Sequence, residues 1–279
     1  MKKMLVVVTA IIILGFISTV KAEAWSITWG DWEYYGGLYV ENEDDYDEWM
    51  VGPTSSPLSN DIAAGGDSGY AYSWMSASPF TIGTETQTDS GDYGCFGDAL
   101  AGGALYNSFI LDGSGEVPTW LTIDLEGSLS GGIYGEGYNE AEVIAALWIA
   151  EAGTFPEDLT DLLDFDNGEP EFGEPDWFSE EYLEDFDGTT VIDEHYSELG
   201  YPDAGQEYEV LAVLLSGSYS ETDASMSEAY ANTYFGNSLE FRLTPGDIEP
   251  IPEPATMLLF GLGAVGFGAL KKRKKNIYG

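Results

Sequence analysis

The sequence predicts an all-β protein whose body is one β-sandwich of jelly-roll type. Many short segments alternate apolar and polar residues, and Gly-rich turns separate them. The 279-residue chain is 44% hydrophobic and 14% aromatic, which is too apolar for a disordered polyanion. About 225 residues lie between the two terminal segments, enough for one all-β domain with a substantial core.

The first half of the body contains four candidate strand regions. In chain order they are Trp25–Tyr39 (one or two strands), Tyr70–Met75, Ala104–Leu111 and Trp120–Leu129. Tyr70–Met75 alternates large and small side chains, as a half-buried strand does. Glu41–Glu48 is expected to form an acidic loop. Gly52–Gly69 is rich in Pro, Ser and Gly and is also expected to be a loop.

Residues Ala141–Ala152 admit two interpretations. Asn139 as an N-cap and Gly153 beyond the end favour a helix. A period of two, with Val143 and Leu147 facing inward, favours a strand. We prefer the strand because the neighbouring segments are strands.

The amino-acid composition of the body changes between residues 151 and 209. This segment has 21 acidic residues and four scattered prolines. It is expected to be an acidic surface insertion with short helices at Glu157–Leu163 and Ser179–Phe186. Strand patterns then return at Tyr208–Leu215, Ala229–Phe235 and Ser238–Leu243.

The body is strongly acidic. Between Trp25 and Pro252 there are 48 carboxylates and one cation, Arg242, which leaves about 47 negative charges. Such a charge excludes nucleic acid as a partner and favours divalent cations. Two interpretations stay open: a solvated surface adapted to salt, and carboxylates that bind Ca²⁺.

One segment partly matches a calcium loop. Asp185, Asp187, Gly188 and Glu194 have the spacing of positions 3, 5, 6 and 12 of an EF-hand, but Leu183 stands where the first ligand belongs. A second acidic turn, which contains Asp164 and Asp166, lacks the spacing. Ca²⁺ is therefore a candidate ligand of Asp185, Asp187 and Glu194, and no other cofactor is expected.

The sequence does not indicate an enzyme. His195 is the only histidine and Cys95 the only cysteine, so a His/Cys zinc site cannot be assembled. We expect His195 to lie at the surface. Cys95 is either a buried thiol or an intermolecular link. Paired carboxylates could make a secreted hydrolase, but the many acidic residues single out no pair.

A cluster of aromatic residues near the start of the body suggests a second function. Trp29, Trp32, Tyr34 and Tyr35 lie within seven residues, and exposed aromatic rings can stack on sugars. The competing interpretation is that these rings belong to the core.

The N-terminus is expected to be a secretory signal peptide, residues 1–24. Lys2 and Lys3 precede the apolar stretch Met4–Val20, and Ala22-Glu23-Ala24 provides a small-residue cleavage site for signal peptidase, with Val20-Lys21-Ala22 as an alternative site. An uncleaved membrane anchor is the alternative.

The C-terminus, residues 250–279, combines three features. Pro252-Glu253-Pro254 precedes an apolar run at Ala255–Leu270, which is the expected transmembrane helix, and five cations follow at Lys271–Lys275. A basic cluster after a membrane span stays in the cytoplasm, which places the body, residues 25–249, outside the inner membrane.

This tail resembles the PEP-CTERM sorting signal of bacterial exported proteins. The resemblance covers about thirty residues and implies that a membrane protease, exosortase, recognises Pro252, Glu253 and Pro254 and discards the helix and the basic end. It also implies a Gram-negative host that makes exopolysaccharide. We therefore expect an exported, non-enzymatic protein of the cell surface or extracellular matrix, with a carbohydrate-binding module as the alternative.

Overall fold

The computed structural model describes residues 25–66, 69–91, 95–156, 159, 175–222 and 227–246. The expected signal peptide, the membrane span at 255–270 and the motif Pro252-Glu253-Pro254 lie outside the described residues, as do Asp164 and Asp166. Among the described residues, no helix has the length and hydropathy of a membrane span.

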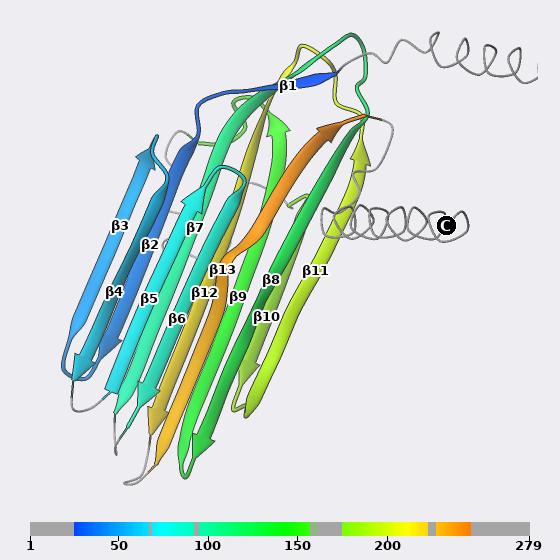
Figure 1. Ribbon diagram of the computed structural model, residues 1–279. Helices are drawn as coiled ribbons and strands as arrows, with labels where there is room; N and C mark the ends of the chain where they lie inside the picture. Colours follow the sequence, from blue (N-terminus) through cyan, green and yellow to red (C-terminus); the bar gives the residue numbers. More distant parts are fainter. Residues whose placement is uncertain are drawn as a thin grey trace, which may run out of the picture.

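The described strands form two antiparallel sheets (Figure 1). Sheet A has the order β10-β9-β12-β7-β2-β3, and the short β1 also pairs with β7. Its strands are β1 (Ser26–Trp29), β2 (Glu33–Asn42), β3 (Tyr46–Thr54), β7 (Phe96–Asp112), β9 (Gly137–Glu151), β10 (Trp177–Glu184) and β12 (Glu207–Thr222).

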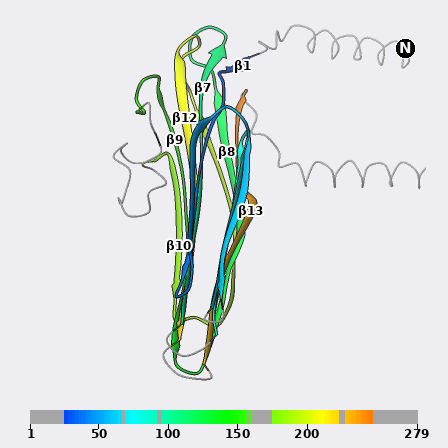
Figure 2. The ribbon, with the colours of Figure 1, turned by 90° about the vertical axis from the view of Figure 1, so that its left-hand side faces the viewer.

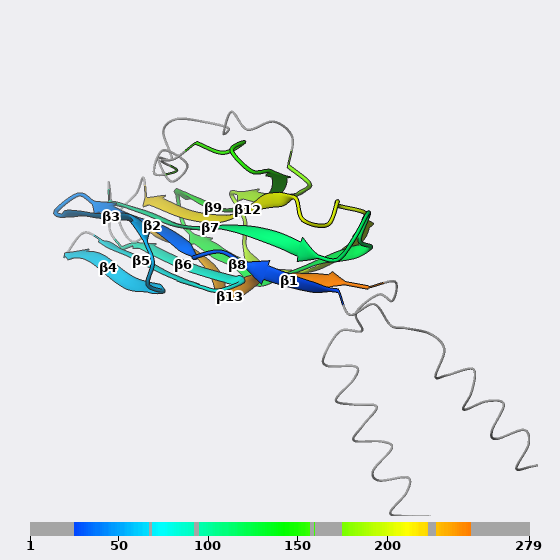
Figure 3. The same cartoon turned by 90° about the horizontal axis from the view of Figure 1, so that it is seen from above.

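Sheet B has the order β11-β8-β13-β6-β5-β4. Its strands are β4 (Leu58–Gly66), β5 (Gly69–Ser78), β6 (Thr81–Ser90), β8 (Thr119–Tyr134), β11 (Gly188–Gly200) and β13 (Glu228–Pro245). Seen from the side, the body is two thin layers with the strands running along its length (Figure 2). Seen from above, sheet A lies over sheet B (Figure 3). The predicted all-β sandwich is confirmed.

The strands β6–β13 are distributed between the two layers in the order of a jelly roll, with β9 and β10 forming a hairpin within sheet A. Sheet B places them as β11-β8-β13-β6 and sheet A as β10-β9-β12-β7, so each successive pair occupies matching positions in the two sheets. Two four-stranded sheets connected in this way make the eight-stranded jelly roll. The strands β2 to β5 extend both sheets on the side of β6 and β7.

The main core lies between the two sheets and follows the period of two. On β8, Leu121, Ile123 and Leu125 are buried while Glu126 is exposed, as the sequence predicts. On β9, Val143 and Leu147 are fully buried, which confirms the strand interpretation of Ala141–Ala152. Burial of both inner faces against each other stabilises the sandwich.

The two strand segments expected at Ala229–Phe235 and Ser238–Leu243 are one strand, β13, with an irregularity in its pairing with β6 between Phe235 and Leu239 and in its pairing with β8 between Tyr234 and Leu239. Opposite this irregularity, β8 carries Gly127. A Cβ on Gly127 would lie 2.3 Å from the ring of the fully buried Phe235. The glycine therefore leaves room for the ring, and the bulge bends β13 without ending the strand.

A second, smaller core lies on the outer face of sheet A. It consists of Tyr35, Ala104, Ala146, Trp148, Phe155, Leu159, Leu211 and Val213. Glu209 holds the turn after β9 onto this face. Its carboxylate accepts hydrogen bonds from the backbone N–H groups of Gly153 (2.8 Å), Thr154 (3.2 Å) and Phe155 (3.3 Å), and from the Tyr106 hydroxyl (2.8 Å). One buried carboxylate thus satisfies four donors.

Two sequence-based expectations need correction. The expected helix at Ser179–Phe186 is wrong, because Trp177–Glu184 is strand β10, in which Trp177 and Ser179 face inward and Phe178 and Glu180 outward. The described parts of segment 151–209 contribute β10 and β11, which are edge strands of the two sheets. Of the helix expected at Glu157–Leu163, only Leu159 is described.

The expected loops in the first half are shorter than predicted. Within Gly52–Gly69, strand β4 covers Leu58–Gly66 at the edge of sheet B. Within Glu41–Glu48, both ends belong to strands, and Asn42 closes the turn by accepting hydrogen bonds from the N–H groups of Asp44 (2.9 Å) and Asp45 (2.8 Å). An edge strand tolerates small residues that sequence patterns assign to turns.

Candidate ligand-binding surface

The strand β5 presents three large aromatic side chains on the outer face of sheet B. Tyr70, Tyr72 and Trp74 alternate with Ala71, Ser73 and Met75, which are fully buried between the sheets. Side chains two residues apart on a strand share a face and stand about 6.6 Å from each other. We call Tyr70, Tyr72 and Trp74 the β5 aromatic stripe.

Small neighbours leave the β5 aromatic stripe accessible on the side of β4. Tyr70, Tyr72 and Trp74 pair in register with Gly65, Ala63 and Asp61 of that edge strand. The Tyr70 side chain is 37% exposed, and Tyr72 and Trp74 are half-buried. Because the neighbours on β4 are short, they do not cover the larger rings.

Polar side chains flank the stripe on its other side. In register on β6, Asp89 lies beside Tyr70, Gln87 beside Tyr72 and Glu85 beside Trp74. Burial raises the pKa of Glu85, and burial followed by the charge of Glu228 raises the pKa of Asp89. The rim of the stripe therefore offers carboxylate and amide oxygens as acceptors.

The hydroxyl groups of Tyr70 and Tyr72 remain protonated at neutral pH. Burial raises the pKa of both, and the charges of Asp61 and Glu85 add to the effect. No hydrogen bond from either hydroxyl contributes to these shifts among the described residues. As far as the described residues show, both hydroxyls are thus available as donors.

The outer face of sheet A has a different arrangement, in which tyrosine hydroxyls are paired with carboxylates two residues along the same strand. The hydroxyls of Tyr138 and Tyr219 donate to Glu140 (2.7 Å) and Glu221 (2.8 Å). The same pairing joins Tyr39 to Glu41 and Tyr46 to Glu48. We call these four pairs the tyrosine–carboxylate face.

Asp98 lies in the middle of this face. It pairs in register with Glu41 of β2 and Tyr219 of β12, and Glu140 follows on β9 in the same row. Burial, then the charges of Glu41 and Glu140, raises the pKa of Asp98 to about 6, against a smaller opposing hydrogen bond from the Ala99 backbone. The face thus concentrates negative charge that the described residues do not neutralise.

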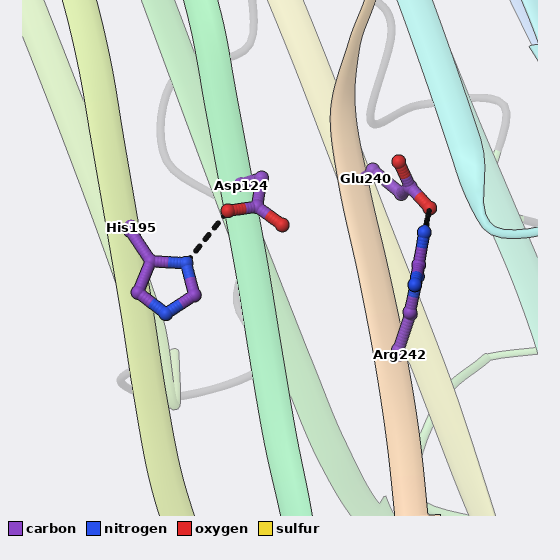
Figure 4. A network of polar contacts seen from close by, with 4 residues as sticks. All are labelled: Asp124, His195, Glu240 and Arg242. Atoms are coloured by element: carbon purple, nitrogen blue, oxygen red, sulfur yellow. Dashed lines mark hydrogen bonds and ion pairs between the residues drawn. The ribbon is translucent and has the colours of Figure 1, made fainter. Parts of the chain in front are cut away.

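Two ion pairs lie on the outer face of sheet B, on strands β8, β11 and β13 (Figure 4). His195 Nδ1 is 2.6 Å from Asp124 Oδ1, and Arg242 lies 2.5 Å from Glu240. Asp124 stands between His195 and Glu240 in register. The side chains of His195 and Asp124 are 43% and 47% exposed, so this is the expected surface histidine, and such exposed pairs contribute little stability.

The candidate calcium ligands are not brought together. Asp185 and Asp187 lie in the turn before β11, where Asp185 adopts a positive φ of 48°. Glu194 lies on β11, about 23 Å further along the extended strand from Asp187, since a strand rises about 3.3 Å per residue. Glu194 instead accepts a hydrogen bond from Ser179 Oγ (2.9 Å). Across the described residues, no group of three or more His, Cys, Asp or Glu has a metal-binding arrangement.

The aromatic residues proposed for sugar stacking belong mainly to the core. Tyr34 and Tyr35 are buried. Trp29 and Trp32 stack on each other with ring centroids 5.5 Å apart, and both contact Phe80 edge-on. These rings close one end of the sandwich. Cys95 is also buried.

The β5 aromatic stripe is the surface that residue-by-residue interpretation missed. Its signal was present, because Tyr70–Met75 alternates large and small residues. The pattern identifies a strand but does not say which set of side chains faces the solvent. Here the small set fills the close contact between the sheets and the large set points outward.

Comparison with known proteins identifies the tail. The family described as the PEP-CTERM protein-sorting motif matches residues 250–274. No curated protein and no solved structure matches the chain. The matched motif is the signal that exosortase processes, so the chain carries an address for export and sorting through the membrane.

Proposed function

We propose that this exported, exosortase-sorted protein is a non-enzymatic interaction protein of the cell surface or extracellular matrix of a Gram-negative bacterium. The observation that carries the proposal is the position of the large exposed aromatic side chains, which stand on open sheet faces and edges. Tyr70, Tyr182 and Tyr234 are examples, at 37%, 45% and 57% exposure.

Open faces suit an extended partner better than they suit catalysis. An active site excludes water around the reacting atoms and usually lies in a concave pocket. The β5 aromatic stripe and the tyrosine–carboxylate face both lie on sheet surfaces, where side chains in rows can contact a long polymer. The proposal also includes removal of residues 1–24 by signal peptidase before the body reaches its destination.

A co-sedimentation assay tests this proposal. The exported protein is incubated with insoluble polysaccharide from the producing strain, and both the bound protein and the newly formed reducing ends are measured. We expect the protein to sediment with the polysaccharide and the number of reducing ends to stay constant. Release of new reducing ends in proportion to protein would contradict the non-enzymatic role and favour a secreted hydrolase.

A carbohydrate-binding module is the second candidate function, and the β5 aromatic stripe favours it. Aromatic rings with adjacent polar groups are the usual components of sites that bind sugars and other small polar molecules. The residues that support this candidate are Tyr70, Tyr72 and Trp74, in place of the aromatic residues near the N-terminus of the body.

A further inference from the structure

We propose that the β5 aromatic stripe binds an uncharged polysaccharide chain. The inference rests on the carbohydrate-binding candidate and adds the site and the class of sugar. The pyranose rings would stack on Tyr70, Tyr72 and Trp74, and their hydroxyl groups would donate to Asp61, Glu85 and Gln87, which stand beside the rings in register.

The spacing of the rings suits a linear chain. Tyr70, Tyr72 and Trp74 occupy alternate positions of one strand, so the line from the first ring to the third is about 13 Å long. Aromatic rings offer large, rigid, apolar area at low cost in conformational entropy. A row of this length contacts two or three successive sugar rings rather than a single one.

The polar groups beside the rings select against acidic sugars. Asp61 precedes the stripe on β4, and Glu85, Gln87 and Asp89 follow it on β6. Carboxylate oxygens accept strong hydrogen bonds from hydroxyl donors. The same carboxylates repel a chain that carries uronates or sulfates, and the net charge of the whole chain, −41, adds to this repulsion.

Two other aromatic groups of the protein are less suitable. On the tyrosine–carboxylate face, the hydroxyls of Tyr39, Tyr138 and Tyr219 are already committed to neighbouring glutamates. Trp29 and Trp32 pack against each other and against Phe80. The hydroxyls of Tyr70 and Tyr72 show no such commitment among the described residues.

Affinity electrophoresis of the exported protein tests the inference. The gels contain hydroxyethyl cellulose as the neutral probe, alginate as the acidic probe or chitosan as the amine-bearing probe. We expect retardation by hydroxyethyl cellulose that persists at 0.5 M NaCl, and none by alginate. Trp74→Ala and Tyr72→Ala should each weaken binding to the neutral probe at least tenfold, while Trp74→Phe retains most of it.

The controls separate the site from the fold and from net charge. Tyr201→Ala removes a tyrosine that is 59% exposed and lies beyond β11, at the opposite edge from β4, and should leave binding unchanged. Each variant is used only after its melting temperature matches that of the parent, and Tyr72→Ala keeps the test decisive if Trp74→Ala does not fold. Binding to chitosan should disappear in 0.5 M NaCl and be the same in stripe variants, because it reflects the polyanionic surface alone.

Two different failures are distinguishable. If the neutral probe binds but Trp74→Ala and Tyr72→Ala bind it like the parent, the assignment of the stripe is overturned and the carbohydrate-binding candidate stands. If the protein binds no neutral polysaccharide, or binds alginate more tightly, the candidate and the inference are both overturned. The proposal of a non-enzymatic interaction protein is then decided by the co-sedimentation assay.

Discussion

Replacement of Glu209 by alanine is expected to lower the free energy of unfolding by about 2–4 kcal/mol. The carboxylate accepts hydrogen bonds from three consecutive backbone N–H groups, those of Gly153, Thr154 and Phe155, and from the Tyr106 hydroxyl. Hydrogen bonds to a charged group contribute about 1.5–3 kcal/mol, and buried donors left without an acceptor add a desolvation penalty. Urea unfolding measures the difference.

Hydrogen exchange shows whether the loss has the expected cause. In Glu209→Ala the amides of Gly153, Thr154 and Phe155 should exchange at least tenfold faster. The amides of β8, an interior strand of sheet B, should exchange faster only by the amount that the loss of global stability accounts for. Glu207→Ala is the matched control, because Glu207 is exposed on the same strand. Equal stability of the two alanine variants would contradict the role assigned to Glu209.

Replacement of Asp98 by asparagine is expected to stabilise the protein above pH 6, by about 2–3 kcal/mol at pH 8. The pKa of Asp98 is raised from 3.8 to about 6, chiefly by burial and then by Glu41 and Glu140. Between those two pH values the native state holds a proton that the unfolded state has released, so this group lowers stability as pH rises. Each pKa unit corresponds to about 1.4 kcal/mol.

The pH dependence of the difference is the decisive observation. The stability of Asp98→Asn minus that of the parent should be close to zero below pH 4 and should grow through pH 4–6 to a plateau. Thermal unfolding over pH 3.5–8 at constant ionic strength provides the measurement. Asp61→Asn, at an exposed position on the edge strand β4, should shift stability little at any pH. A difference for Asp98→Asn that does not vary with pH would show that the carboxylate is not the cause.

The fold is largely predictable from the sequence because period-two alternation is local information. Leu121, Ile123 and Leu125 reveal their strand and its buried face directly. Strand β10 was missed because its acidic surroundings and nearby prolines resemble a surface insertion, although Trp177 and Ser179 alternate with Phe178 and Glu180. Edge strands carry many polar residues in any sheet, so composition alone does not distinguish them from surface loops.

The candidate surface was less predictable than the fold. Whether Tyr72 or Ser73 faces the solvent depends on how closely β5 approaches the opposite sheet, and that distance is set by residues far away in sequence. Among the described residues, the candidate calcium ligands lie apart for a similar reason. The spacing of Asp187 and Glu194 suits a ligand loop only if the chain curls, but residues 188–200 extend along β8.

The C-terminal motif marks this β-sandwich for export and for sorting by exosortase. Intact-mass spectrometry of the protein recovered from the medium or cell surface tests this sorting most directly. We expect a mature chain that lacks residues 1–24, or residues 1–22 if cleavage follows Ala22, and that ends close to Pro254. A mass that retains Lys271–Lys275 on most exported molecules would contradict sorting by exosortase.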